Sequence, residues 1–234
     1  LGPPLYHPEM ASRMDEVGVA TGLAWTPAGG EILFIEASRS RGHGKLKFTG
    51  RLGDVMKESV EAAYSYLRSH IDEVGLPEDL FETTDLHVHV PAGSIPKDGP
   101  SAGVAMVVSL ASVLTGRRIR HDFAMTGEIT LKGRILPVGG VREKVLAARR
   151  AGVRTVILPL WNRKDLENIA PQVKEDLRFI HVESIEDVLE AVLDAESMAS
   201  VYIDPTATAT VVAGEPAEEG ARRGKCVSSI IPGH

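Results

Sequence analysis

Cysteine is almost absent from this sequence: Cys226 is the only one, so no disulfide can form within the chain. A reducing compartment, and with it a cytoplasmic localisation, is therefore expected. No apolar run approaches the ~20 residues that a membrane-spanning helix needs, so no membrane partner is predicted. Positive charge is also in deficit, with 26 Lys and Arg against 32 Asp and Glu and a net charge of −6. The sequence therefore carries no electrostatic signal for binding nucleic acid.

What is present is typical of one globular domain with flanking segments. Of the 234 residues 43% are apolar and 25% are charged, which is enough for a sizeable core. Residues 1–15 contain three prolines and no periodic pattern, and the chain starts at Leu1 without methionine or signal peptide. We therefore interpret 1–15 as a linker from an upstream module and 16–196 as the domain. Small and charged residues dominate 197–234, which predicts a disordered tail.

Apolar periodicity predicts a block of strands followed by strands that alternate with helices. Strands are expected at 17–26, 31–37, 45–49, 85–90, 123–126, 128–136, 155–158 and 179–182. Helices are expected at 54–74, 102–114, 141–151 and 185–194, with a helical turn at 165–169. This order favours an α+β fold in which helices pack on mixed sheets.

A turn rich in Gly and Pro, PKDGPSAG at residues 96–103, precedes the most apolar predicted helix. Ser101 then lies at the start of that helix, where free backbone N–H groups and the helix dipole favour negative charge. A serine nucleophile that forms a tetrahedral oxyanion benefits from such a position. The alternative is that Ser101 only caps the helix.

Lys144 is the one lysine on the apolar face of the predicted helix 141–151, beside Val141, Val145 and Ala148. It could extend its ammonium group into water along a buried stem. Alternatively, burial lowers its pKa, because desolvation disfavours the charged form. A neutral lysine can deprotonate a serine hydroxyl.

Other polar patterns in the sequence are weaker. His87 and His89 alternate on one strand without a third metal ligand at suitable spacing. The segment 42–45, GHGK, lacks the flanking residues of a phosphate-binding loop, so no nucleotide site and no bound cofactor are predicted.

Several motifs occur in a fixed order: DEVGVATGLAW at 15–25, VHVP at 88–91 followed by PKDGPSAG, AMTGE at 124–128, LPVGG at 136–140, and Glu143-Lys144. With them, residues 17–194 resemble the proteolytic domain of the Lon protease family, in its bacterial and organellar branch. The resemblance implies a fold similar to domain 2 of ribosomal protein S5. It also implies a Ser–Lys dyad with Ser101 as nucleophile and Lys144 as base.

The same resemblance implies supporting residues and partners. Thr126 would hold the lysine, and Asp98, next to Gly99 and Pro100, would take part in switching the serine loop between inactive and active arrangements. The implied activity is that of a serine endopeptidase acting on unfolded or damaged proteins in protein quality control, as part of an ATP-dependent homo-hexamer. ATP and magnesium would bind an upstream ATPase module. Two alternatives stay open: a catalytically silent assembly or binding module, and a Ser–Lys amidase of small molecules.

Overall fold

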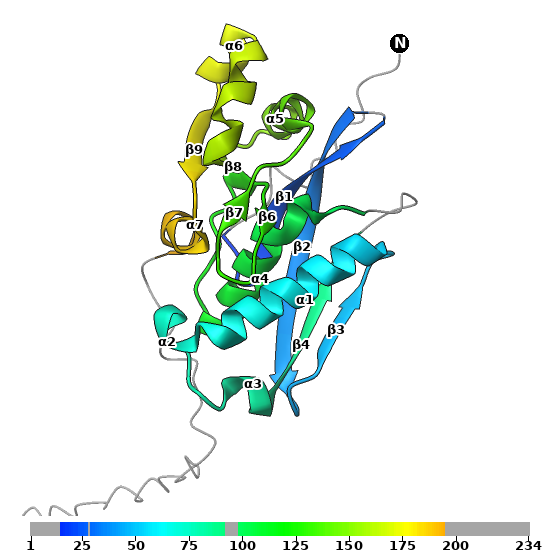
Figure 1. The fold of residues 1–234 in the computed structure, drawn as a ribbon, viewed down its shortest axis with the longest axis vertical. Coiled ribbons are helices and arrows are strands. Elements are labelled where there is room, and N and C mark those ends of the chain that lie inside the picture. Colours follow the sequence, from blue (N-terminus) through cyan, green and yellow to red (C-terminus); the bar gives the residue numbers. More distant parts are fainter. Residues whose placement is uncertain (1–14, 28, 92–97, 195–234) are drawn as a thin grey trace, which may run out of the picture. The chain divides into compact units, whose positions relative to one another are not determined.

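The computed structural model describes residues 15–27, 29–91 and 98–194 (Figure 1). The predicted tail at 197–234 and nearly all of the predicted linker at 1–15 lie outside the described residues. Within the described part, a sheet of seven strands has the order β3-β4-β2-β1-β5-β8-β9. Its strands are β1 (Val19–Thr26), β2 (Gly29–Arg41), β3 (Leu46–Thr49), β4 (Thr84–His89), β5 (Phe123–Met125), β8 (Thr155–Pro159) and β9 (Arg178–Val182).

The sheet is mixed, because β1–β2 and β2–β4 pair antiparallel and the other pairs are parallel. Since β1, β5 and β8 run in the same direction, their carboxyl ends meet at one edge. A separate hairpin joins β6 (Glu128–Ile129) to β7 (Ile135–Leu136). The predicted single strand 128–136 is therefore wrong: Gly133, with φ 77°, lies in the turn that reverses the chain.

Seven α-helices and two 3₁₀ helices are found in the described residues. They are α1 (Asp54–Ser69), α2 (Ile71–Val74), α3 (Leu80–Thr83), η2 (Pro100–Ala102), α4 (Gly103–Thr115), α5 (Val141–Arg150), η3 (Leu160–Asn168), α6 (Pro171–Glu175) and α7 (Ile185–Val192). The predicted helix 54–74 is divided at His70. There the Ser69 hydroxyl and the His70 ring both hydrogen-bond to the Tyr66 carbonyl. Neither α3 nor α6 was predicted, because each is too short to show a period.

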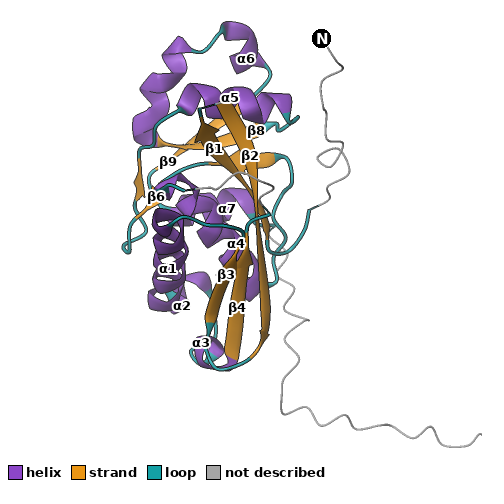
Figure 2. Ribbon diagram, turned by 90° about the vertical axis from the view of Figure 1, so that its right-hand side faces the viewer, coloured by secondary structure: helices purple, strands orange, loops and turns teal. Residues whose placement is uncertain are grey.

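Two apolar clusters lie on opposite faces of the sheet, because successive side chains of a strand alternate. Met125 and Ile157 face the larger cluster, which contains α4 and α1. Their neighbours Ala124 and Val156 face the smaller cluster, which contains α5. Figure 2 shows α1 and α4 on one side of the strands. The predicted fold class, mixed sheets with packed helices, is confirmed.

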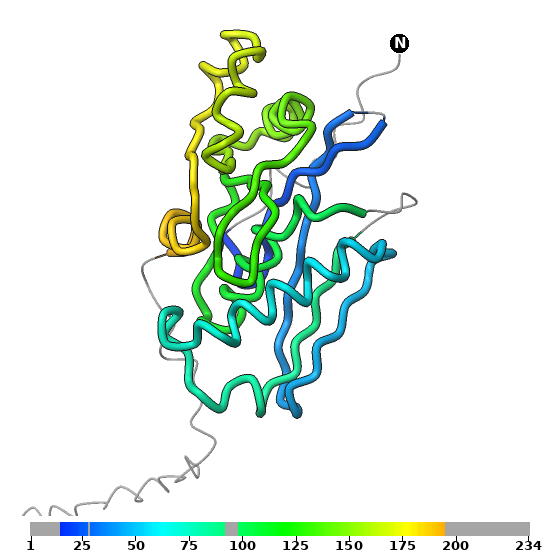
Figure 3. The backbone as a smooth tube through the Cα atoms, viewed as in Figure 1, coloured from blue at the N-terminus to red at the C-terminus, as the bar shows by residue number. Residues whose placement is uncertain are grey.

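The helix α4 is buried on every side, and its residues 103–114 are all buried. Because α4 is so enclosed, its amino end is fixed by tertiary packing on several sides. The Gly127 N–H donates to the Ser101 carbonyl at 2.9 Å, and the Val104 N–H donates to the Gly127 carbonyl at 3.1 Å. The chain after β5 thus passes directly beside the start of α4 (Figure 3). None of the helices in the described ranges is both long and apolar enough to cross a membrane.

Candidate active site

Ser101 lies in η2, the single 3₁₀ turn that leads into α4. Gly99 has φ 128° and ψ 155°, a backbone conformation that side chains disfavour, and Pro100 follows as the first residue of the turn. The residue that caps α4 is Ala102, and neither η2 nor α4 has a side-chain cap. The alternative interpretation of Ser101 as a helix cap is therefore wrong, and its hydroxyl makes no hydrogen bond to another described residue.

Lys144 is 2% exposed, so the alternative of an ammonium group extended into water is also wrong. It shares the buried side of α5 with Val141, Val145 and Ala148, which belong to the smaller apolar cluster. Its Nζ donates a hydrogen bond of 3.0 Å to Thr126 Oγ1, and no ion pair in the described residues involves it. Burial without a compensating carboxylate lowers the pKa of Lys144 to about 8.

Thr126 joins the lysine to the serine loop. It follows β5 directly and is fully buried. Its hydroxyl accepts from Lys144 Nζ and donates at 3.0 Å to the Ser101 carbonyl oxygen. One hydroxyl therefore sets the positions of both the Lys144 side chain and the Ser101 backbone.

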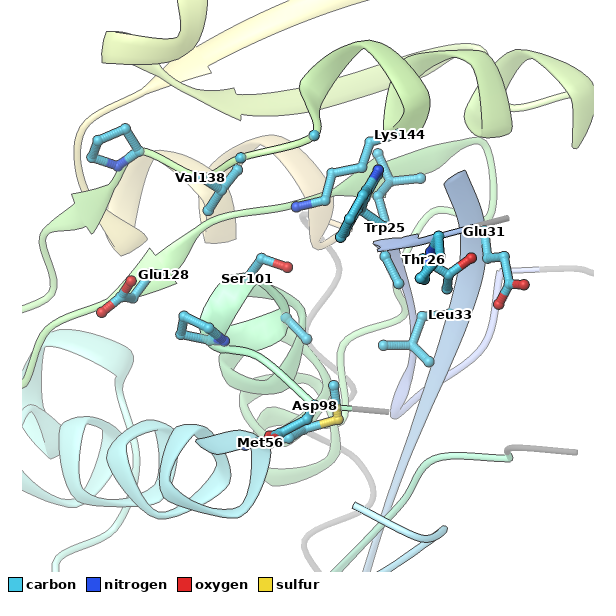
Figure 4. Close-up of a pocket in the computed structure, with 18 residues that line it drawn as sticks. Trp25, Thr26, Glu31, Leu33, Met56, Asp98, Ser101, Glu128, Val138 and Lys144 are labelled. Carbon is cyan, nitrogen blue, oxygen red and sulfur yellow. Dashed lines mark hydrogen bonds between the residues drawn. The ribbon is translucent and has the colours of Figure 1, made fainter. Parts of the chain in front are cut away.

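Ser101 and Lys144 open into one cleft of about 590 Å³. In Figure 4 both side chains point into this cleft, Lys144 from α5 above and Ser101 from below. Among the hydrogen bonds of the described residues, none joins the Ser101 side chain to the Lys144 side chain. The cleft is also lined by the end of β1 at 23–26, by Leu33 and Met56, and by the segment 137–140, among others.

Asp98 holds the serine loop against the first turn of α1. Its Oδ1 accepts from the Met56 N–H at 3.0 Å and from the Gly99 N–H at 2.9 Å. Gly53, which precedes α1, leaves room for this carboxylate, since a Cβ there would lie 2.3 Å from Asp98 Cγ. Asp98 hydrogen-bonds to neither Ser101 nor Lys144, so in this arrangement it supports the loop's backbone.

The remaining sequence candidates lie elsewhere. His87 and His89 both hydrogen-bond to Thr49 Oγ1 on the sheet, at 2.9 and 2.7 Å. Within the described ranges no three metal-ligating side chains come together. In the segment 42–45, the backbone N–H groups of His43 and Lys45 are bound by Asp85.

Sequence reasoning missed two parts of the site. Trp25 is 56% exposed at the cleft, although it stands in a strand, and its large apolar surface was the only signal. Asn162 is 3% exposed and holds Val138 at the cleft wall. No local pattern could have revealed it, because its partner lies 24 residues earlier.

Comparison with known proteins identifies the class as a proteolytic domain. Residues 1–195 match the family described as the Lon protease (S16) C-terminal proteolytic domain. Similar proteins include "Lon protease 2" of Myxococcus xanthus, 54% identical over 94% of this chain and 26% of that protein. "Lon protease" of Syntrophus aciditrophicus is 55% identical over 82% of this chain and 24% of its own length. "Lon protease homolog 2, peroxisomal" of Homo sapiens is 54% identical over 83% of this chain and 23% of its own length.

The chain belongs to the Lon protease C-terminal proteolytic domain family. It spans about a quarter of the length of these relatives. The family resemblance and the enzyme class, a hydrolase of the protease type, are thereby confirmed. The roles of individual residues stay predictions.

Proposed function

We propose that this chain is a serine endopeptidase domain in which Ser101 attacks the peptide bond and Lys144 is its general base. The observation that carries the proposal is the state of Lys144. It is buried and forms no ion pair with any described residue, its pKa is lowered to about 8, and it faces the same cleft as a serine whose hydroxyl caps no helix. At a pH near this pKa about half of the lysine is neutral and able to accept a proton.

The proposed reaction begins when neutral Lys144 takes the proton from Ser101 Oγ. The oxygen attacks the scissile carbonyl, and Lys144 then donates the proton to the leaving amine. A water molecule hydrolyses the resulting ester with Lys144 again as base. Thr126 keeps Lys144 Nζ directed toward the cleft in both protonation states, because the Thr126 hydroxyl accepts a hydrogen bond from Nζ.

The oxyanion requires hydrogen-bond donors near the start of α4. The Ser101 N–H donates to no other described residue and lies at the amino end of η2 and α4. There the helix dipole adds to its effect on a negative oxygen. We assign the Ser101 N–H as one donor.

An extended polypeptide fits the cleft better than a small amide does. The strand β1 pairs with β5 only at Gly22, so no described strand pairs with this edge of β1 at 23–26, where it borders the cleft. An extended substrate can add to such an edge through backbone hydrogen bonds. Stably folded proteins offer no free strand, so unfolded or damaged proteins are the proposed substrates.

We further propose that the whole protein is an ATP-dependent homo-hexamer. The names and lengths of the relatives support a larger Lon protease, of which this chain would be one part. ATP and magnesium would bind outside this chain, and no cofactor would bind within it. The cytoplasm is the proposed location; the peroxisome, which the name of one relative mentions, is the alternative.

The experiment is Ser101→Ala, assayed on an unfolded protein such as casein, on a fluorogenic peptide and on small amides. Loss of turnover by a factor on the order of 10⁴–10⁶ is expected, as for other serine nucleophiles. The circular dichroism spectrum should not change. Residual activity within about tenfold of the original would remove Ser101 from the role. Turnover of small amides but not of casein would favour the amidase.

A further inference from the structure

Asn162 is a buried polar side chain whose oxygen and both N–H groups have hydrogen-bond partners. Its Oδ1 accepts from the Val138 N–H at 2.9 Å. Its Nδ2 donates to the Val138 carbonyl at 2.9 Å and to Asp165 Oδ2 at 2.6 Å. A carboxylate can only accept, so Asp165 determines which end of the amide carries the nitrogen.

The position of Asn162 follows from the topology of the sheet. It comes shortly after β8, whose carboxyl end lies at the same edge as those of β1 and β5. Thr126 follows β5 at this edge, and Trp25 is near the end of β1. Each of the three parallel strands therefore delivers one residue to the region of the cleft.

The Val138 N–H and carbonyl both hydrogen-bond to the Asn162 amide, as the two backbone groups of one residue bond to one partner in an antiparallel strand pair. A residue that donates and accepts toward one partner is extended, and the backbone groups of its neighbours point the opposite way. Asn162 does not line the cleft, whereas Pro137 and Gly139 do. On this pattern the Pro137 carbonyl is directed away from Asn162, and neither it nor the Gly139 backbone groups hydrogen-bond to another described residue.

We propose that Asn162 is a positioning residue, which holds the segment 137–139 extended so that it binds the backbone of a peptide substrate. The substrate then lies between two backbone edges, that of β1 at 23–26 and that of the segment 137–139. This inference rests on the proposed peptidase function. Asn162 reaches no reacting atom and acts through Val138 alone.

The position of Lys144 depends little on this hydrogen-bonded pair. The helix α5 is anchored by Val141, Val145 and Ala148 in the apolar cluster, and the Thr126 hydroxyl holds Nζ. Loss of Asn162 should therefore weaken the binding of extended peptides and leave the chemistry of Ser101 nearly unchanged. A residue of merely structural importance would reduce both together.

The test compares Asn162→Ala with Asn168→Ala, an exposed asparagine of the same helix η3 that makes no hydrogen bond to Val138. Both changes are made in a Ser101→Ala background, and binding of a labelled extended peptide is followed by fluorescence anisotropy. Asn162→Ala should raise Kd about tenfold, the equivalent of one lost backbone interaction. Asn168→Ala should stay within about twofold. Hydrogen exchange at the Val138 amide should accelerate in Asn162→Ala only.

Accelerated exchange at Val138 with an unchanged Kd would overturn the inference, as would absence of peptide binding by the Ser101→Ala chain. Neither result bears on the Ser101 chemistry, which is tested separately by a small serine-directed fluorophosphonate on the chain with Ser101 intact. That reagent should inactivate Asn162→Ala and the unmodified chain at rates within about twofold. If Asn162→Ala does not fold, Asp165→Ala replaces it in the test. This substitution should also raise Kd, because loss of the Asp165 carboxylate frees the Asn162 amide to rotate.

Discussion

Replacing Lys144 by Met should stabilise the folded chain near neutral pH while abolishing peptidase activity. The pKa of Lys144 falls from 10.5 to about 8 on folding. At ~1.36 kcal/mol per pKa unit, this difference means that burying the charged lysine destabilises the folded state by about 3 kcal/mol. Met has a similar length and no charge, and Thr126 keeps its hydrogen bond to the Ser101 carbonyl. The lost hydrogen bond from Nζ offsets ~1 kcal/mol, which leaves a gain of about 2 kcal/mol.

The stabilisation should depend on pH in a defined direction. Below the folded pKa of about 8, Lys144 is protonated in both states and the destabilisation is complete. Between about 8 and 10.5 the unfolded chain binds more protons than the folded one, so the original chain gains stability as the pH rises. At pH ~10 only about 1 kcal/mol of the destabilisation remains, and the advantage of Lys144→Met should have disappeared.

Urea unfolding of both proteins, followed by circular dichroism at pH ~7 and pH ~10, measures this difference. Lys132→Met, at an exposed lysine of the β6–β7 turn, is the control and should change stability little at either pH. A Lys144→Met protein that is less stable than the original at both pH values would refute the reasoning. It would mean that the ammonium has stabilising partners in the folded chain.

Three further substitutions follow from the same geometry. Lys144→Arg should be as inactive as Lys144→Ala, because a guanidinium stays protonated, and activity of the original chain should rise with pH through about 8; an active arginine variant assayed on casein would contradict the dyad. Thr126→Val removes both the acceptor for Lys144 and the donor to Ser101, so kcat should fall about 10–100-fold, to a value between that of the original chain and those of the inactive Lys144 variants. Unfolding in urea should show that the free energy of unfolding falls by ~1–3 kcal/mol. Gly53→Ala places a Cβ 2.3 Å from Asp98 Cγ and should displace the serine loop, lowering kcat on a fluorogenic peptide with little change in circular dichroism; unchanged kcat would show that Asp98 does not position the loop.

Much of the fold was predictable because the long elements carry strong apolar periods. The strands 17–26 and 85–90 and the helices 102–114 and 141–151 appear close to their expected bounds as β1, β4, α4 and α5. The failures are local in origin. The division of 54–74 at His70 depends on two side chains that compete for one carbonyl, and the reversal at 130–134 depends on a turn within an apolar stretch.

By itself the sequence indicated the two residues on which the proposed chemistry rests, although local pattern left a helix cap and a solvent-reaching lysine open, and only the ordered motifs that resemble the Lon family implied their catalytic roles. Ser101 stands out because Gly and Pro force a turn before an apolar helix, and Lys144 because it is the one charge on an apolar face. Both signals are short in range, so a single helical period or turn motif contains them.

Only the tertiary structure decided how far burial lowers the pKa of Lys144 and which residues border the cleft. The depth of burial of Lys144 depends on packing between α5 and the sheet, and its partner Thr126 comes from a different strand. Asn162 reaches Val138 because β8 lies beside β5 in the sheet. Such contacts join residues far apart in the chain, and no sequence pattern encodes them because the hydrogen bonds exist only after the strands have paired.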